Sequence, residues 1–379
     1  MGESPSSFAQ PTSGLRMKEG APAIVRPEKE EMDTYPAEAQ KLLDHNRASQ
    51  QAAAGRYDVS WGKGQHFVIA GGTGLGIGCS VATAVMDRVA HHGSLTVIAR
   101  DLSKSLGFAT GVEMQARAEA LGMKERFHWI NDGLALEGKG LQTIADALKT
   151  VGAQQVIYIN SVAAASSGLL PNHPPVFVKD VDADGLFEWQ LTPLTERAIE
   201  ATKFVMGDMA VQFADALMDS GISVAATVFC DWRGSLDKIS RNPSSIEYGR
   251  NGAYSTSLYL PKDAIQAATS KAYGTQKKVL DIFFPIMRTR ALPFIPGGTT
   301  MSYVYDKLMK RMGIRRVDVP ELGLGMLAEI GKALATDGFN PFPRLDAHEL
   351  PLDLWFYEVV QQLNEEASSP FYFKKWFDK

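Results

Sequence analysis

The chain has 379 residues, of which 45% are hydrophobic and 22% are charged, and its formal net charge is −4. This length and apolar fraction are sufficient for a substantial globular core, in one large domain or two smaller ones. The slightly acidic balance provides no basic field for a nucleic-acid partner. The two cysteines, Cys79 and Cys230, stand far apart in segments that read as buried, which favours reduced thiols over a disulfide.

No apolar stretch reaches the length that spans a membrane, and the first residues lack the charged and apolar regions of a secretory signal peptide. We therefore expect a cytoplasmic protein with no membrane partner. Residues 1–34 are rich in serine, proline, glycine and charge, without an apolar period, and are predicted to be mobile. Residues 35–379 are predicted to form a single domain, because no internal repeat and no Gly/Ser linker divides them.

From residue 36 onward the pattern predicts an alternation of helices and strands. Pro36 and Gly55 delimit a first helix over 36–54. Strands are then predicted at 66–71, 95–100, 126–131, 155–160, 222–229 and 289–295. Helices are predicted at 79–93, 104–121, 136–150, 193–219 (with Thr192 as N-cap) and 263–284, whereas 164–191 is expected to be irregular. This alternation predicts an α/β fold with a doubly wound parallel sheet.

Residues 67–78, FVIAGGTGLGIG, are the most informative segment of the chain. A buried strand runs into a glycine-dense turn, and a helix follows at once, which is the context of a dinucleotide-binding fingerprint. The spacing Gly72-x3-Gly76-x-Gly78 is similar to that of short-chain dehydrogenases/reductases. We therefore expect the diphosphate of a nicotinamide dinucleotide to lie over Gly72, Thr73, Gly74, Leu75, Gly76, Ile77 and Gly78. Glycine-rich turns of this kind also bind the phosphates of other ligands, or nothing.

The carboxyl ends of the next two strands suggest how the adenosine half would be held. Arg100 ends the second strand, where an acid would read the free 2′-hydroxyl of NAD and an arginine suits a 2′-phosphate. Arg100 therefore favours NADPH, with NADH possible; the alternative is an ion pair of Arg100 with Asp101. Asp132 follows the third strand and is a candidate cap for the adenine ring, although an Asp after a strand is often only a turn cap.

Two further strand ends are candidates for the nicotinamide half. Small residues after the fourth strand, Ser161, Val162 and Ala163, would let the chain pass close beneath the nicotinamide ribose. Pro296, Gly297 and Thr299 follow the predicted sixth strand and would present backbone and hydroxyl groups to the carboxamide.

The predicted proton donor is Tyr273, with Lys277 four residues on in the predicted helix 263–284. Positions i and i+4 share a helix face, so Lys277 would lower the pKa of the Tyr273 hydroxyl and also bind the ribose. Tyr254, Tyr259 and Lys262 form a competing cluster just upstream.

Several stretches resemble the trans-2-enoyl-CoA / enoyl-acyl-carrier-protein reductases of the short-chain reductase superfamily. The likeness covers roughly residues 60–360 and is carried by 71–78, 156–166, 191–222 and 293–313. The resemblance implies a Rossmann-type reductase domain with extra helices flanking the substrate site. It also implies NAD(P)H-dependent reduction of the double bond of an enoyl thioester, with a tyrosine as proton donor.

The sequence departs from that family at the reaction centre. The family's Tyr-x8-Lys pair is absent, Trp232 stands where the family has a second tyrosine, and an insertion lies near 235–270. The Tyr273-x3-Lys277 spacing is that of ordinary short-chain dehydrogenases. A ketoreductase or alcohol dehydrogenase is therefore the alternative activity, and a non-catalytic relative that binds cofactor is the third.

The C-terminal third is the predicted substrate side. Met301, Tyr303, Tyr305, Met309 and Met312 are expected either to line an apolar slot for a fatty acyl or polyketide-like chain, or to pack in the core. The basic run 307–316 suits the phosphates of CoA or a carrier-protein arm, and equally a solvated helix face. We assign no metal ligands, and the pattern singles out no oligomeric state.

Overall fold

The computed structural model describes most of the predicted domain. The described residues are 38–62, 64–73, 76–89, 92–99, 106–131, 139–162, 176–182, 185–191, 193–231, 256–272, 277–285, 287, 299, 302, 306 and 309–345. The predictions for residues 1–34 and for Trp232 therefore lie outside the described residues, as does most of the predicted insertion.

A six-stranded sheet in the order β3-β2-β1-β4-β7-β8 forms the centre of the molecule, and every pair in it is parallel. Its strands are β1 (His66–Ala70), β2 (Ser94–Ala99), β3 (Phe127–Asn131), β4 (Gln155–Asn160), β7 (Ser223–Asp231) and β8 (Val279–Phe283). The order reverses between β1 and β4. This confirms the predicted doubly wound sheet and places its topological switch point, where such folds bind ligands, at the carboxyl ends of those two strands.

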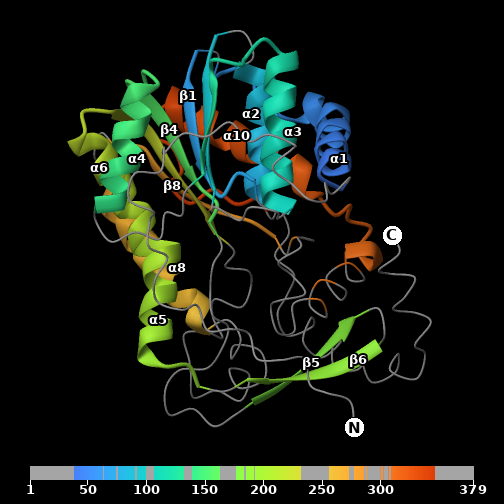
Figure 1. Cartoon of the computed structure of the whole chain (residues 1–379). Helices are drawn as coiled ribbons and strands as arrows, with labels where there is room; N and C mark the ends of the chain where they lie inside the picture. Colours follow the sequence, from blue (N-terminus) through green and yellow to red (C-terminus); the bar gives the residue numbers. More distant parts are fainter. Residues whose placement is uncertain are drawn as a thin grey trace.

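Helices cover both faces of the sheet (Figure 1). One face carries α1 (Glu38–Ala53), α2 (Ile77–Val89), α3 (Leu106–Ala120) and α10 (Val319–Ala335). The other carries α4 (Lys139–Thr150), α6 (Met209–Asp219) and α8 (Thr256–Ala272). Each face buries its own apolar cluster against the sheet, because strands that are covered on both sides need apolar residues on both sides.

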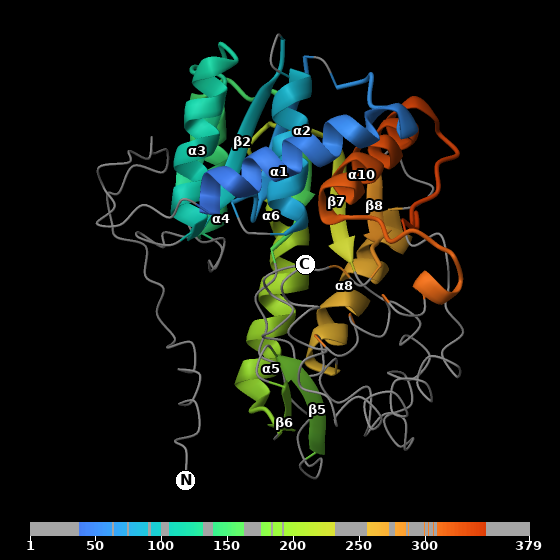
Figure 2. The same cartoon turned by 90° about the vertical axis from the view of Figure 1, so that its right-hand side faces the viewer.

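A hairpin occupies part of the segment 164–191, which was expected to be irregular. Strands β5 (Val176–Asp182) and β6 (Gly185–Leu191) pair antiparallel, so this prediction is wrong. The aromatic and β-branched residues of VFVKDVD and GLFEWQL have a strand propensity that outweighs the nearby Pro and Asp. The hairpin lies beyond the carboxyl ends of the main sheet, at the end where α5 (Glu196–Lys203) and α8 project past the strands (Figures 1 and 2).

The predicted helix 193–219 begins later and is interrupted. Thr195, not Thr192, is the N-cap of α5, and its side chain accepts a hydrogen bond from the backbone N–H of Ala198. A π-helical turn, η3 (Phe204–Asp208), joins α5 to α6. Such turns insert one extra residue into a helix and are frequent near functional sites.

The predicted helix 263–284 is the most consequential error. Helix α8 ends at Ala272, and Val279–Phe283 form the edge strand β8 of the sheet. A five-residue apolar run such as VLDIF cannot be assigned to helix or strand by periodicity alone. The strand predicted at 289–295 lies outside the described residues, and β8 is the sixth strand of the sheet.

The outer edge of β8 is covered by the chain that follows α10. The backbone N–H groups of Asp281 and Phe283 donate to the carbonyls of Pro341 and Pro343, each at 2.9 Å, and Leu345 N–H donates back to Phe283 at 2.9 Å. Because proline offers no N–H to a further strand, this segment protects the edge of the sheet.

Within the described ranges, no helix is both long enough and apolar enough to cross a membrane. Over the same residues, no group of three or more histidine, cysteine, aspartate or glutamate side chains is placed to hold a metal ion.

Candidate cofactor site

The glycine turn begins where β1 ends, at the switch point of the sheet. Ala70 pairs with Ile98 of β2 on one side and with Asn160 of β4 on the other. Gly71 follows with a φ of +81°, a left-handed conformation that favours glycine, and its N–H donates to Ile98 O at 2.8 Å. The chain thereby turns sharply out of the sheet and into α2.

Ser161, the residue after β4, fastens the turn to the sheet. Its backbone N–H and its Oγ both donate to Ala70 O, at 3.0 Å and 2.7 Å. A Cβ built on Gly78 would lie 2.1 Å from Ser161 Oγ and 2.7 Å from Gly71 O. A Cβ on Gly72 would lie 2.8 Å from Cγ1 of Val97. The glycines are therefore required for the close approach of the turn, α2 and β4, which is the arrangement a dinucleotide cradle needs.

The start of α2 is suited to an anion. The helix begins at Ile77, its first turn contains no acidic residue, and Ser80 N–H bonds to Gly76 O at 3.2 Å. The free N–H groups before Ser80 and the positive end of the helix dipole thus stand at the carboxyl edge of the sheet. A diphosphate bound there would be stabilised by both.

Asn160, the last residue of β4, is a feature that the sequence did not single out as a site residue. Its side chain is 4% exposed, and Oδ1 has no hydrogen-bond partner among the described residues. It lies between Ala70 of β1 and Phe229 of β7 in the register of the sheet. A buried acceptor without a partner is costly, so its position at the switch point fits a ligand that donates a hydrogen bond.

Two buried carboxylates lie under α8, and the sequence analysis did not assign them to the site either. Asp231 ends β7, and Asp281 lies inside β8 on the same face, because Phe229 pairs with Asp281 and Asp231 with Phe283. Burial, followed by the charges of Asp281 and Asp231, raises the pKa of the Cys230 thiol. The sequence signal for Asp281 was a carboxylate within the apolar run VLDIF. It was missed because this run was predicted to be helical and not a buried strand.

The structure brings together only part of the predicted cofactor set. Gly72, Thr73, Gly76, Ile77 and Gly78 surround the turn beside Ser161, with Val162 next in the chain. Thr299 is buried and lies between β8 and α10 in the chain. The other predicted cofactor residues apart from Lys277, namely Gly74, Leu75, Arg100, Asp132, Ala163, Pro296 and Gly297, lie outside the described residues.

Of the predicted catalytic pair, only Lys277 lies within the described residues. Lys277 is exposed and lies after the end of α8, two residues before β8, and Tyr273 is outside the described residues. The neighbouring Lys278 reaches Thr336 O and Asp337 at the end of α10. Lys277 thus stands at the amino end of the parallel sheet, at the opposite end of the strands from the glycine turn.

Part of the competing cluster lies within the described residues. Tyr259 and Lys262 are three positions apart in the first half of α8, whereas Tyr254 lies outside the described residues. Since α8 leads into the amino end of β8, its first half is at the carboxyl side of the sheet, the side of the glycine turn.

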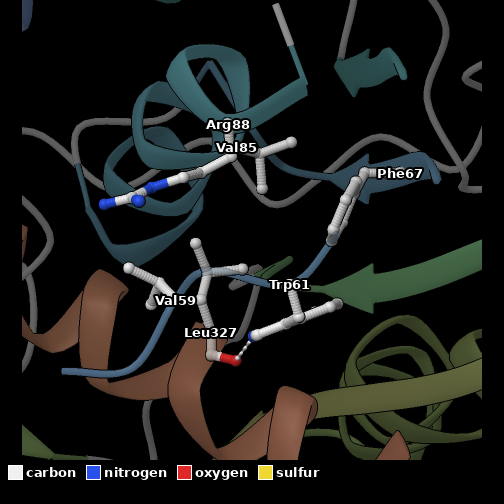
Figure 3. Close-up of a pocket in the computed structure, with 6 residues that line it drawn as sticks. All are labelled: Val59, Trp61, Phe67, Val85, Arg88 and Leu327. Carbon is white, nitrogen blue, oxygen red and sulfur yellow. Dashed lines mark hydrogen bonds between the residues drawn. The ribbon is translucent and has the colours of Figure 1, made fainter. Parts of the chain in front are cut away.

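A small pocket elsewhere in the molecule is unrelated to this site (Figure 3). Phe67 near the start of β1, Val85 and Arg88 late in α2, and Trp61 and Leu327 line it together with Val59. Trp61 Nε1 donates to Leu327 O at 3.0 Å, which fixes the indole in the wall of the pocket. The pocket lies toward the amino ends of the strands, away from the switch point.

Known structures share this architecture. The trans-2-enoyl-CoA reductase of Treponema denticola, solved in complex with NAD, superposes with a TM-score of 0.67 over 92% of this chain and 91% of that chain, at 16% identity. A Clostridium trans-2-enoyl-CoA reductase solved with NADH gives a TM-score of 0.66 over 93% of both chains, at 13% identity. The chain has the fold of the trans-2-enoyl-CoA reductases.

The predicted resemblance is confirmed at the level of the fold. No protein-family model matches the chain, and no curated protein matches its sequence. The likeness to the enoyl-CoA reductases extends over nearly the whole length of both proteins.

Proposed function

We propose that this protein is an NAD(P)H-dependent reductase that saturates the carbon–carbon double bond of an α,β-unsaturated acyl thioester. The observation that carries the proposal is the near full-length likeness to enoyl-CoA reductases solved with NAD or NADH. The cradle formed by Gly71, Gly78 and Ser161 supports it, because that close packing suits a dinucleotide diphosphate.

The residues of the switch point fit the cofactor. The turn and the N-terminus of α2 would hold the diphosphate, while Asn160 and Ser161 would lie on the nicotinamide side. Arg100 would read a 2′-phosphate, which favours NADPH over NADH. When bound, the reduced nicotinamide supplies the hydride that is added to the β-carbon of the thioester.

The chain must then supply a proton to the α-carbon side of the resulting enolate. We assign this to Tyr259, with Lys262, three positions on in α8, lowering the pKa of the Tyr259 hydroxyl and holding the ribose. This assignment takes the place of Tyr273 and Lys277, since Lys277 stands at the far end of the sheet. The ketoreductase alternative is distinguished from this reaction by the label experiment below.

The segment between β8 and α10 is the proposed substrate side. Of its described residues, Thr299, Ser302 and Met309 are buried, and Arg316 is held by Ser302 and Asp306. The segment ends at α10, whose first turn packs on the first turn of α2 beside the cofactor cradle. An acyl-CoA is the proposed substrate, with the acyl chain in an apolar slot at this place.

The reaction is tested by following a deuterium label. The purified protein is incubated with NADPH or NADH deuterated at C4, in each stereochemical form, and with a short enoyl-CoA or a 3-oxoacyl-CoA. Label at the β-carbon of a saturated thioester supports the proposal, whereas label at a carbinol carbon shows a ketoreductase. Saturable binding of both coenzymes without oxidation of either, on any of these substrates, would identify a non-catalytic relative.

A further inference from the structure

We infer that helix α1, which precedes the sheet in the chain, contributes to cofactor binding by holding the N-terminus of α2 in position. Gln50 is the positioning residue. This inference rests on the proposed function, because it concerns where the diphosphate would bind. Figure 2 shows α1 crossing the outer side of α2, from α3 to α10.

Gln50 connects the beginnings of two helices. Its side chain is 5% exposed, and its Nε2 donates to Ser80 O at 2.8 Å, to Ser80 Oγ at 3.3 Å and to Pro320 O at 3.2 Å. Ser80 is in the first turn of α2, and Pro320 is in the first turn of α10. A single side chain of α1 therefore fixes the spacing of these two turns.

The two turns are also in direct contact. Ser80 Oγ donates to Val319 O at 3.0 Å, and a Cβ built on Gly323 would lie 2.5 Å from Ser80 Oγ. Gly323 thus permits α10 to lie against the first turn of α2, which leaves Ser80 enclosed by α1 on one side and α10 on another.

The opposite side of the same turn is fixed by the sheet. Gly78 stands two residues before Ser80 and packs against Ser161 and Gly71. The N–H groups of this turn are the ones proposed to bind the diphosphate, and they are therefore held between the sheet and the junction of Gln50, Ser80 and Gly323. Only residues 78–80 of α2 separate the Gln50 contact from the proposed diphosphate site, so a substitution at Gln50 is expected to affect cofactor binding.

The orientation of the Gln50 amide agrees with a positioning role. Its Oε1 is buried and has no hydrogen-bond partner among the described residues, whereas its NH2 faces three oxygen atoms. Reversing the amide would bring Oε1 against those oxygens, so only this orientation is favourable. The unpartnered Oε1 carries a free-energy cost, and the hydrogen bonds from Nε2 to Ser80 and Pro320 offset it.

The test is a fluorescence titration of NADPH and NADH binding to Gln50→Met, which keeps the size of the side chain and removes its donors. We expect Kd to rise about tenfold, in line with the effect of outer residues that orient a binding group, while kcat at saturating cofactor stays near that of the unchanged protein. Gln51→Met, at the exposed neighbouring position of α1, is the matched control and should leave Kd unchanged.

A role in stability alone would lower the melting temperature of Gln50→Met without changing Kd, and that result would overturn the inference. Should Gln50→Met not fold, Ser80→Ala decides, since it removes the bond to Val319 and one acceptor of Gln50; an unchanged Kd in that variant overturns the inference equally. Failure of the proposed function is distinguishable, because a protein that binds neither coenzyme shows no saturable titration before any substitution, and a ketoreductase or a non-catalytic relative is identified by the label experiment with the unchanged protein.

Discussion

Gly78 of α2 and Ser161 after β4 approach so closely that a Cβ on Gly78 would stand 2.1 Å from Ser161 Oγ. The contact joins two segments 83 positions apart and locks the first turn of α2 onto the sheet where the strand order reverses. Because Ser161 Oγ also bonds to Ala70 O at 2.7 Å, neither side of the contact can yield without breaking the end of the β1–β4 pairing. The shape of the cradle is thus set by backbone packing.

Gly78→Ala is therefore expected to disrupt the cradle. The added methyl group must displace α2 or Ser161, and overpacking of this kind costs about 1–3 kcal/mol of folding free energy. We expect cofactor affinity to fall by at least ~30-fold, since a helix N-terminus moved by roughly an ångström no longer meets the diphosphate. Titration of NADPH fluorescence measures the affinity, and chemical unfolding measures the stability.

Gly55→Ala is the matched control, because a Cβ there meets nothing within 4 Å. The double change Gly78→Ala with Ser161→Ala should recover only part of the loss, since Gly71 O would still lie 2.7 Å from the added carbon. Full recovery in the double variant would show that Ser161 alone, and not the backbone of the turn, limits the space.

The proton donor is tested by Tyr259→Phe. Loss of a positioned acid should lower kcat by about a hundredfold or more, while the Kd for NADPH changes little. Lys262→Met should lower kcat and weaken cofactor binding together, because the lysine is assigned to both the hydroxyl and the ribose. Lys277→Met serves as the control and should leave both constants unchanged, since Lys277 stands at the amino end of the sheet. Full activity in Tyr259→Phe would move the assignment to Tyr254.

Coenzyme preference is tested at Arg100. Arg100→Ala should raise the Kd for NADPH by about tenfold or more and change the Kd for NADH little. The reason is that the guanidinium would bind the 2′-phosphate, which only NADPH carries. The ratio of the two dissociation constants, from parallel titrations at one salt concentration, is the measured quantity. An equal loss for both coenzymes would show that Arg100 does not read the 2′-phosphate.

The sequence predicted the fold well where local signals and the global fold agree. Runs of apolar residues located β1 and β2, and the strand predicted at 155–160 has the observed bounds of β4. The turn at 71–78 could be recognised because its glycines follow a buried strand and precede a helix in the chain. Those features depend on short stretches of chain, which a sequence displays directly.

The errors arose where long-range contacts decide the structure. Val279–Phe283 becomes a strand because β7 and the segment 341–345 pair with it, and neither neighbour is visible in five apolar residues. The prediction that Lys277 lies in a helix followed from that one error. The sequence contained no signal for Gln50, because its partners Ser80 and Pro320 are distant in the chain and are brought beside it only by the fold.

His66 provides a test of the sheet under acid conditions. It begins β1, is buried, and its Nε2 lies 2.8 Å from Thr96 Oγ1, with the ring of His128 stacked 6.3 Å away. Burial, and secondly the neighbouring His128, lowers the pKa of His66 from 6.5 to about 4. Below pH 6.5 the unfolded chain therefore binds a proton at this position that the folded chain does not.

The free energy of unfolding should consequently fall as the pH drops from 6.5 toward 4, by up to about 3 kcal/mol from this group. Urea unfolding at pH 7.5 and pH 4.5 measures the difference, and His66→Gln should reduce it. His45→Gln, at an exposed position of α1, is the control and should retain the full difference. If His66→Gln loses as much stability between the two pH values as the unchanged protein, His66 is not the group that titrates.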